Sequence, residues 1–139
     1  MTASLFEISQ TFTFDAAHTL AVEGNQPEYF RTHGHSFTCE VTMRGTKTPR
    51  HGWVMDLGLL KDVLGKAREN LDHRMLNEVP GLETPTLENI AEWVAGQVFD
   101  KLKDHSFDNE ELTVHRVTVM RTTIGETCVH YPTNLPRLA

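Results

Sequence analysis

The residues of this sequence best suited to chemistry are two histidines, His33 and His35, at the start of a segment of alternating apolar and polar residues. Side chains alternate between the two faces of a strand, so both imidazoles fall on the apolar face with Phe37 and Cys39. They lie about 6.6 Å apart along that strand, which lets them converge on one ion. Gly34 between them lets a ligand approach the backbone.

A third imidazole, His18, ends an upstream strand-like segment whose apolar residues occupy the even positions. If the two strands pair antiparallel, the end of the first meets the start of the second, and His18 falls beside His33 and His35. Three neutral nitrogen ligands without a fourth from the protein are typical of a catalytic zinc that keeps a position open. These histidines could instead be ordinary polar residues at strand ends, but three of them in register favour a Zn²⁺ site on His18, His33 and His35.

The adjacent pair Asp72 and His73 is a second candidate for chemistry. A carboxylate that accepts from one imidazole nitrogen fixes the tautomer and raises the basicity of the other nitrogen. The pair could also be a charge device at the end of a helix. Both interpretations stay open from spacing alone.

Composition limits the kind of partner. The chain has 139 residues, a net charge of −6 and two cysteines. We expect one domain, 1–139, large enough to bury a core without disulfides. The acidic balance and the lack of a basic cluster argue against nucleic acid and membrane partners and favour a small-molecule substrate. The free cysteines, with no apolar run long enough to span a bilayer, indicate a reducing cytoplasm.

Hydrophobic periodicity predicts the elements that carry these residues. Strands are predicted over residues 8–18, 33–44, a short 53–55, 112–122 and 126–131. Helices are predicted over 57–71, capped by Asp56, and over 87–102, capped by Thr84 or Thr86. The fold class is therefore α+β, a four-stranded antiparallel sheet with two consecutive helices on one face. Its exposed edges predict a homo-oligomer.

Five motifs, in order along nearly the whole chain, resemble the 6-pyruvoyl-tetrahydropterin synthase and 6-carboxy-tetrahydropterin synthase family. They are Phe14-Asp15-Ala16-Ala17-His18, His33-Gly34-His35-Ser36-Phe37, Gly52-Trp53-Val54-Met55-Asp56-Leu57, Leu71-Asp72-His73-Arg74-Met75-Leu76-Asn77 and Pro85-Thr86-Leu87-Glu88-Asn89. Any one of these motifs is weak, but the five in sequence are specific.

The resemblance implies the tunnelling fold, an oligomeric barrel built as a hexamer of two trimers with active sites at subunit boundaries. It implies zinc on the three histidines, a proton relay through Asp72 and His73, and a pterin-binding Glu88, whose alternative role is to complement a helix dipole. The implied activity is a zinc-dependent lyase on 7,8-dihydroneopterin triphosphate, foremost that of 6-carboxy-tetrahydropterin synthase on the route to queuosine. Arg31 and Arg74 flank the site and could meet a triphosphate.

Two positions depart from the family pattern. Tyr29 stands where the family has its proton-abstracting cysteine, and Thr123 stands where it has a pterin-anchoring glutamate. Glu28 or Tyr29 is expected to replace the cysteine, while Glu126 would need a loop shift to replace the anchor. A relative with a glutamate near Glu28 cleaves the substrate to a hydroxymethylpterin.

These departures leave alternatives open. The chain could cleave its substrate to 6-hydroxymethyl-dihydropterin, or bind another heterocycle. A third alternative is a cupin-like metal dioxygenase, because His33 and His35 followed by Glu40 resemble the first cupin metal motif. Strand parity turns Glu40 away from both histidines, and two central helices do not suit an all-β barrel.

Overall fold

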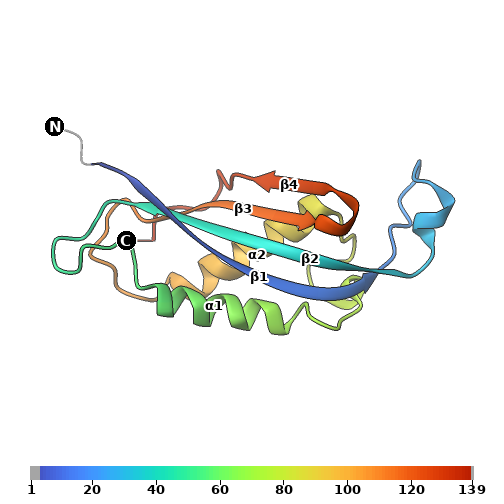
Figure 1. The fold of residues 1–139 in the computed structure, drawn as a ribbon, viewed down its shortest axis with the longest axis horizontal. Coiled ribbons are helices and arrows are strands. Elements are labelled where there is room, and N and C mark those ends of the chain that lie inside the picture. The colour runs from blue at the N-terminus through green and yellow to red at the C-terminus, as the bar shows by residue number, and fades with distance from the viewer. Residues whose placement is uncertain (1–3, 139) are drawn as a thin grey trace.

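The computed structural model describes residues 4–138, which form a four-stranded antiparallel sheet with two helices on one of its faces (Figure 1). The strands are β1 (Phe6–His18), β2 (His33–Gly45), β3 (Thr113–Arg121) and β4 (Glu126–His130), and the helices are α1 (Leu57–Glu69) and α2 (Leu87–Leu102). The predicted α+β architecture is confirmed.

The sheet follows chain order, β1-β2-β3-β4, with every neighbouring pair antiparallel. β1 and β2 pair over their full length, from Phe6 opposite Gly45 to His18 opposite His33. The loop between them, which contains a short 3-10 turn at Pro27–Phe30, extends away from the end of the sheet (Figure 1). β3 pairs with β2 only as far as Thr38, so the first residues of β2 have an open edge.

Both helices begin at side chains that cap the first turn. Asp56 accepts from the backbone N–H of Gly58 (2.8 Å), and Thr86 accepts from that of Asn89 (3.1 Å), which resolves the choice between Thr84 and Thr86. Such caps satisfy N–H groups that have no partner within a helix. α1 packs against β1 and α2, whereas α2 packs against β3 and β4.

The core lies between the sheet and the helices and continues beneath the histidines. Phe14 on β1 and Phe37 on β2 are each 1% exposed and stack with ring centroids 4.8 Å apart. The ring of Phe37 also contacts His18 edge-on, with centroids 6.1 Å apart. Close packing of this kind restricts side-chain rotamers, so the phenylalanines hold the strand ends that carry the imidazoles.

The predicted short strand over residues 53–55 is wrong, because this segment forms a bend without a strand partner. Its backbone groups are satisfied locally. Trp53 O accepts from Thr48 N–H (2.9 Å), and Val54 O accepts from the side-chain amide of Asn109 (2.9 Å). Asn109 is buried and also bonds to the backbone of Thr46, so a single amide ties this loop down.

No helix within residues 4–138 combines the length and the apolar character needed to cross a bilayer.

The stacked phenylalanines predict a difference between two positions on one strand. Phe14→Ala is expected to lower the free energy of unfolding by about 3–5 kcal/mol, because it leaves a cavity in the core. Phe6→Ala, at a residue that is 44% exposed on the same strand, should cost less than about 1 kcal/mol. Urea denaturation measures both, and equal losses would contradict the described core.

Candidate metal centre and active site

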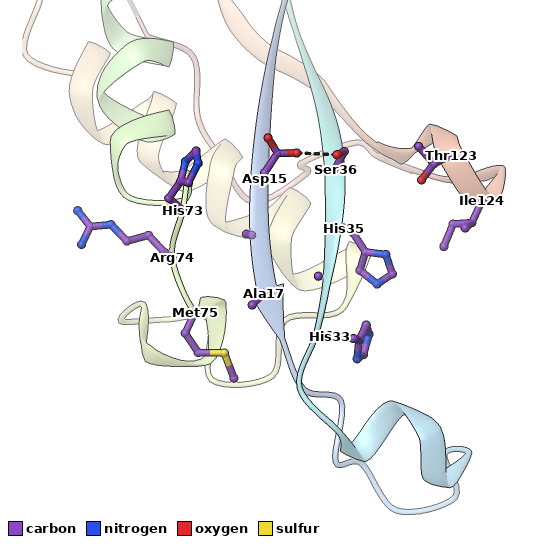
Figure 2. A pocket seen from close by; sticks show the side chains of 12 residues that line it. Asp15, Ala17, His33, His35, Ser36, His73, Arg74, Met75, Thr123 and Ile124 are labelled. Carbon is purple, nitrogen blue, oxygen red and sulfur yellow. Dashed lines mark hydrogen bonds between the residues drawn. The ribbon is translucent and has the colours of Figure 1, made fainter.

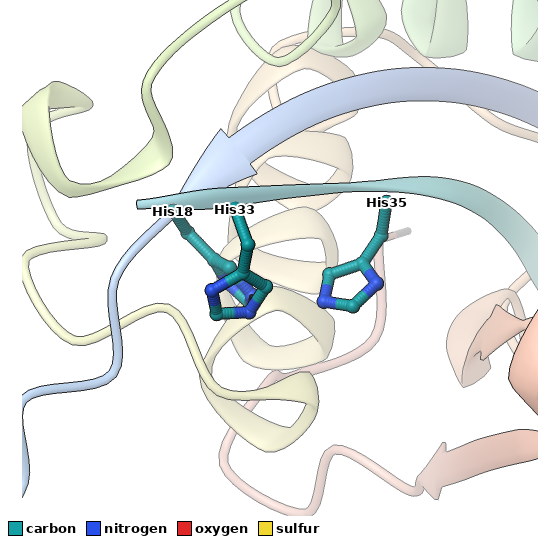
Figure 3. Close-up of side chains that lie close together, drawn as sticks. All are labelled: His18, His33 and His35. Atoms are coloured by element: carbon teal, nitrogen blue, oxygen red, sulfur yellow. Dashed lines mark hydrogen bonds between the residues drawn. The ribbon is translucent and has the colours of Figure 1, made fainter. Parts of the chain in front are cut away.

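Three imidazoles converge at the end of the sheet, as strand parity predicts. His18 from β1 and His33 and His35 from β2 point to the same side (Figure 3). Their ring centroids lie 4.6, 4.9 and 5.0 Å apart, and one nitrogen from each ring falls within 4.8 Å of the others. His18 is 1% exposed, while the other two rings are half-buried and open toward solvent.

Backbone carbonyls fix the outer nitrogens of two of these rings. His18 Nδ1–H donates to Pro85 O (3.2 Å), and His33 Nδ1–H donates to Arg31 O (2.8 Å), because a carbonyl can only accept. In the neutral rings, both Nε2 atoms then carry lone pairs, and they face each other 3.0 Å apart. Two acceptors cannot bond to each other, so the arrangement calls for a cation between them.

The donor set fits a divalent metal ion. Two nitrogens on a tetrahedral zinc, each about 2.0–2.1 Å from it, lie about 3.3 Å apart, close to the Nε2 separation seen here. Metal-binding histidines usually donate their other ring N–H to a carbonyl or carboxylate, as His18 and His33 do. Three protein ligands leave a coordination position for water or substrate. The three-histidine group could therefore hold a catalytic metal.

Burial and neighbouring charges favour the neutral, metal-binding form of two of these imidazoles, those of His18 and His35. Burial, followed by the neighbouring His33 and His35, lowers the pKa of His18 from its ordinary 6.5 to about 4. Burial and the Arg121 guanidinium likewise lower the pKa of His35.

Arg121, at the end of β3, is a site residue that sequence reasoning missed. Its Nη1 lies 3.4 Å from His35 Nε2, and its Nε lies 2.9 Å from Glu126 Oε1. The available signal was strand parity, which places this charged residue on the same apolar face as Val117 and Val119. Glu126 is therefore connected to the three-histidine group through the side chain of Arg121.

A shallow, open depression of about 940 Å³ runs across the ends of β1 and β2 beside the histidines (Figure 2). Its lining includes His33, His35, His73, Thr123 and Ile124. Small residues at the ends of β1 and β2 leave its floor without bulky side chains.

Asp72 and His73 form the predicted carboxylate–imidazole pair. Asp72 Oδ2 accepts from His73 Nδ1–H at 2.9 Å, and Arg68 Nη2 lies 3.1 Å from the same oxygen. Asp72 Oδ1 accepts from the backbone N–H of Asp15 (3.0 Å). This backbone hydrogen bond, followed by the bond to His73, lowers the pKa of Asp72, so the carboxylate stays ionised at neutral pH.

Backbone strain and exposure single out His73. Its φ of +58° lies in the left-handed region that residues with a Cβ seldom adopt, and its side chain is 80% exposed. The next residues, Arg74 and Met75, pair with Ala17 along the edge of β1 away from β2. His73 is thus separated from the histidines of β2 by β1, as Figure 2 shows.

The candidates for the missing cysteine occupy the loop before β2. Tyr29 O accepts from Leu20 N–H (2.7 Å), and the Tyr29 ring lies with its centroid 6.0 Å from that of His33. Glu28 is exposed on the same 3-10 turn, and no contact within residues 4–138 joins its carboxylate to the histidines. The structure therefore brings Tyr29, rather than Glu28, next to the site.

Glu88 lies in the first turn of α2 and lines a separate cavity of about 490 Å³ with Glu126 and Cys128. Burial and Glu88 raise the pKa of the Cys128 thiol, which keeps it protonated. Cys39 is fully buried in the sheet, and burial raises its pKa as well. Neither thiol is activated as a nucleophile or base.

The protein is therefore a single-sheet α+β domain. Two helices cover one face of the sheet, and three histidines at its end form a candidate metal site. The family model of 6-pyruvoyl tetrahydropterin synthase matches residues 7–132. The chain therefore belongs to the 6-pyruvoyl tetrahydropterin synthase family, which its sequence motifs predict.

Two relatives illustrate the range within the family. A dihydroneopterin monophosphate aldolase from Pyrococcus furiosus is 40% identical over 86 residues, 62% of this chain and 68% of the relative. A 6-carboxy-5,6,7,8-tetrahydropterin synthase from Synechocystis sp. is 37% identical over 120 residues, 83% of this chain and 85% of the relative.

The fold has a solved counterpart in the Caenorhabditis elegans 6-pyruvoyl tetrahydropterin synthase. It superposes with a TM-score of 0.76 at 21% identity and covers 96% of this chain and 99% of that chain.

The facing lone pairs predict tight binding of zinc. His33→Ala should weaken zinc affinity by more than the roughly 10- to 100-fold typical of changes to outer partners of a metal site, because a direct ligand is lost. His130→Ala, a change on β4 outside the cluster, should leave the affinity unchanged. Competition with a chromophoric chelator measures both. Equal zinc affinity in wild type and His33→Ala would contradict the assignment.

The lowered pKa of His18 predicts that the metal-free protein loses stability in mild acid. Unfolded His18 takes up a proton near its ordinary pKa of 6.5, but the folded protein does so only near a pKa of about 4. The unfolded state therefore binds more protons in this window, and stability falls as pH decreases through it. The expected loss is at most about 3 kcal/mol.

Urea denaturation of metal-free protein between pH 6.5 and pH 4 measures this slope. His18→Gln should reduce the slope, whereas His105→Gln, at an exposed position, should not. An unchanged slope in His18→Gln would show that another group governs the acid response.

Proposed function

We propose that this protein is a zinc-dependent lyase that cleaves the side chain of a 7,8-dihydroneopterin phosphate. Membership of the pterin synthase family supports the substrate class, and the three converging imidazoles support the metal. The choice of reaction depends on the lack of an activated thiol. Cys39 is buried in the core, Cys128 lies on β4, and the tyrosine ring of Tyr29 occupies the loop beside His33.

A site without a thiol favours a reaction that removes its first proton from oxygen rather than from carbon. Zinc held by His18, His33 and His35 would polarise the side-chain hydroxyls of the substrate and lower their pKa. Retro-aldol cleavage begins with the loss of a proton from this acidified hydroxyl, and the Pyrococcus furiosus relative is named as an aldolase for dihydroneopterin monophosphate. We therefore favour 6-hydroxymethyl-7,8-dihydropterin as the product.

The reaction balances with one base and one acid. A base takes the proton of the 2′-hydroxyl, the C1′–C2′ bond breaks, and C2′ leaves as the carbonyl carbon of glycolaldehyde phosphate. The electron pair passes to C1′ and the conjugated pterin ring, and C1′ then takes up a proton.

His73 is suited to both proton transfers. Its Nδ1–H is held by Asp72, so its Nε2 is free to accept or donate a proton. Because β1 separates His73 from the histidines of β2, we propose that it serves the metal site of a neighbouring subunit. The edge of β4 and the part of the β1 edge before Asp15, which carry no further strand within the described residues, support such a homo-oligomer, in which sheets join edge to edge.

A 6-carboxy-tetrahydropterin synthase activity on 7,8-dihydroneopterin triphosphate, on the route to queuosine, is the second candidate. The Synechocystis sp. relative, which matches a longer part of the chain, favours it. Tyr29 would then act in place of the family cysteine, from its position beside His33.

Incubation of zinc-loaded protein with dihydroneopterin monophosphate and triphosphate tests the proposal. We expect 6-hydroxymethyl-7,8-dihydropterin by liquid chromatography. His73→Gln should lower kcat on the order of a hundredfold or more, since it removes the proton carrier. His105→Gln, at an exposed position, is the matched control. A 6-carboxy product would support the second candidate instead, and no pterin product from either substrate would contradict the proposed function.

A further inference from the structure

Arg121 places a fixed positive charge beside a site that is built to hold a cation. Its side chain is only 12% exposed, and it projects from the face of β3 that otherwise carries core valines. Burying a guanidinium costs free energy unless its N–H groups find acceptors. The burial of this charge therefore has to be compensated by acceptors that bind the guanidinium.

The described contacts of Arg121 involve only some of the N–H donors of its guanidinium. Nε lies 2.9 Å from Glu126 Oε1 but forms no hydrogen bond within the described residues, and Nη1 lies 3.4 Å from His35 Nε2. A guanidinium has five N–H donors in a rigid plane, so donors remain for a further acceptor. Glu126 is 46% exposed at the rim, so water weakens its hold on the charge.

A guanidinium next to three metal-type ligands opposes metal binding by charge repulsion. Such a pairing becomes favourable when an anion binds to both positive groups at once, because the attraction of each group to the anion then offsets their mutual repulsion. Arginine suits this role better than lysine, since its planar fork matches the oxygens of a phosphate.

The other arginines near the site are placed less well for this task. Arg31 is exposed at the end of the 3-10 turn, where its backbone carbonyl accepts from His33. The Arg74 side chain reaches back to Glu69 O (3.4 Å) and points away from the histidines (Figure 2). Of the three, Arg121 alone contacts an imidazole of the cluster through its side chain within the described residues.

We propose that Arg121 is the anion-recognition residue of the site, binding the phosphate ester of the substrate beside the metal and selecting phosphorylated over free dihydroneopterin. The proposal rests on the proposed function for its substrate class. It makes Arg121 a specificity-determining residue and makes Glu126 the carboxylate that holds the guanidinium until the anion enters.

The test is the ratio of dissociation constants for dihydroneopterin and dihydroneopterin monophosphate on zinc-loaded protein, measured by isothermal titration calorimetry. Arg121→Met should reduce the preference for the phosphate ester on the order of tenfold to a hundredfold, the range for a lost charge-assisted hydrogen bond. Arg121→Lys should retain part of the preference through its charge, and Arg137→Met, at an exposed residue paired with Glu111, should leave it intact.

Two further measurements separate anion recognition from a structural role. Chelator competition should show zinc affinity retained or increased in Arg121→Met, because a repelling charge is removed. Glu126→Gln should keep or strengthen the phosphate preference, whereas a purely structural clip would make Glu126→Gln and Arg121→Met equivalent. An unchanged preference in Arg121→Met, or its loss in Arg137→Met instead, would overturn the proposal.

If wild-type protein binds neither pterin, the proposed function fails, and inorganic phosphate then tests Arg121 alone. Weaker phosphate binding by Arg121→Met than by zinc-loaded wild type supports the anion site, and equal binding overturns it.

Discussion

The antiparallel register between β1 and β2 is the constraint on which the site depends. It sets His18 opposite His33 at the last of thirteen paired positions and leaves His35 one pleat further along the same face. A slip of one residue would turn His33 and His35 to the opposite face of the sheet. The core prevents that slip, because Phe14 and Phe37 stack from the same two strands. Packing and metal ligation are thus specified by one alternating pattern.

The sequence predicts this part of the structure well because its signals are local and periodic. Parity alone places the three imidazoles on one face, and the helix starts follow from side chains such as Asp56 that bond within one turn. The short strand predicted over 53–55 fails for the opposite reason. Val54 and Met55 are buried, but the backbone carbonyl of Val54 bonds to the side chain of Asn109, more than fifty residues away along the chain, and not to another strand.

Long-range placement also explains what sequence reasoning left out at the site. Arg121 reaches His35 only because β3 lies beside β2, and its approach to Glu126 depends on the turn between β3 and β4. Motif order identifies Asp72 and His73 as a pair, yet only the structure puts them on the outer side of β1. Asp72 and His73 lie across β1 from the metal ligands of their own chain. In the proposed homo-oligomer they would act at the metal site of a neighbouring subunit.

We propose that His18, His33 and His35 bind one zinc ion through nitrogen and leave a position open. X-ray absorption spectroscopy of the zinc-loaded protein tests it most directly. We expect three imidazole nitrogens about 2.0–2.1 Å from the metal together with one oxygen ligand. A sulfur ligand at about 2.3 Å, or a spectrum unchanged when the three histidines are replaced, would contradict it.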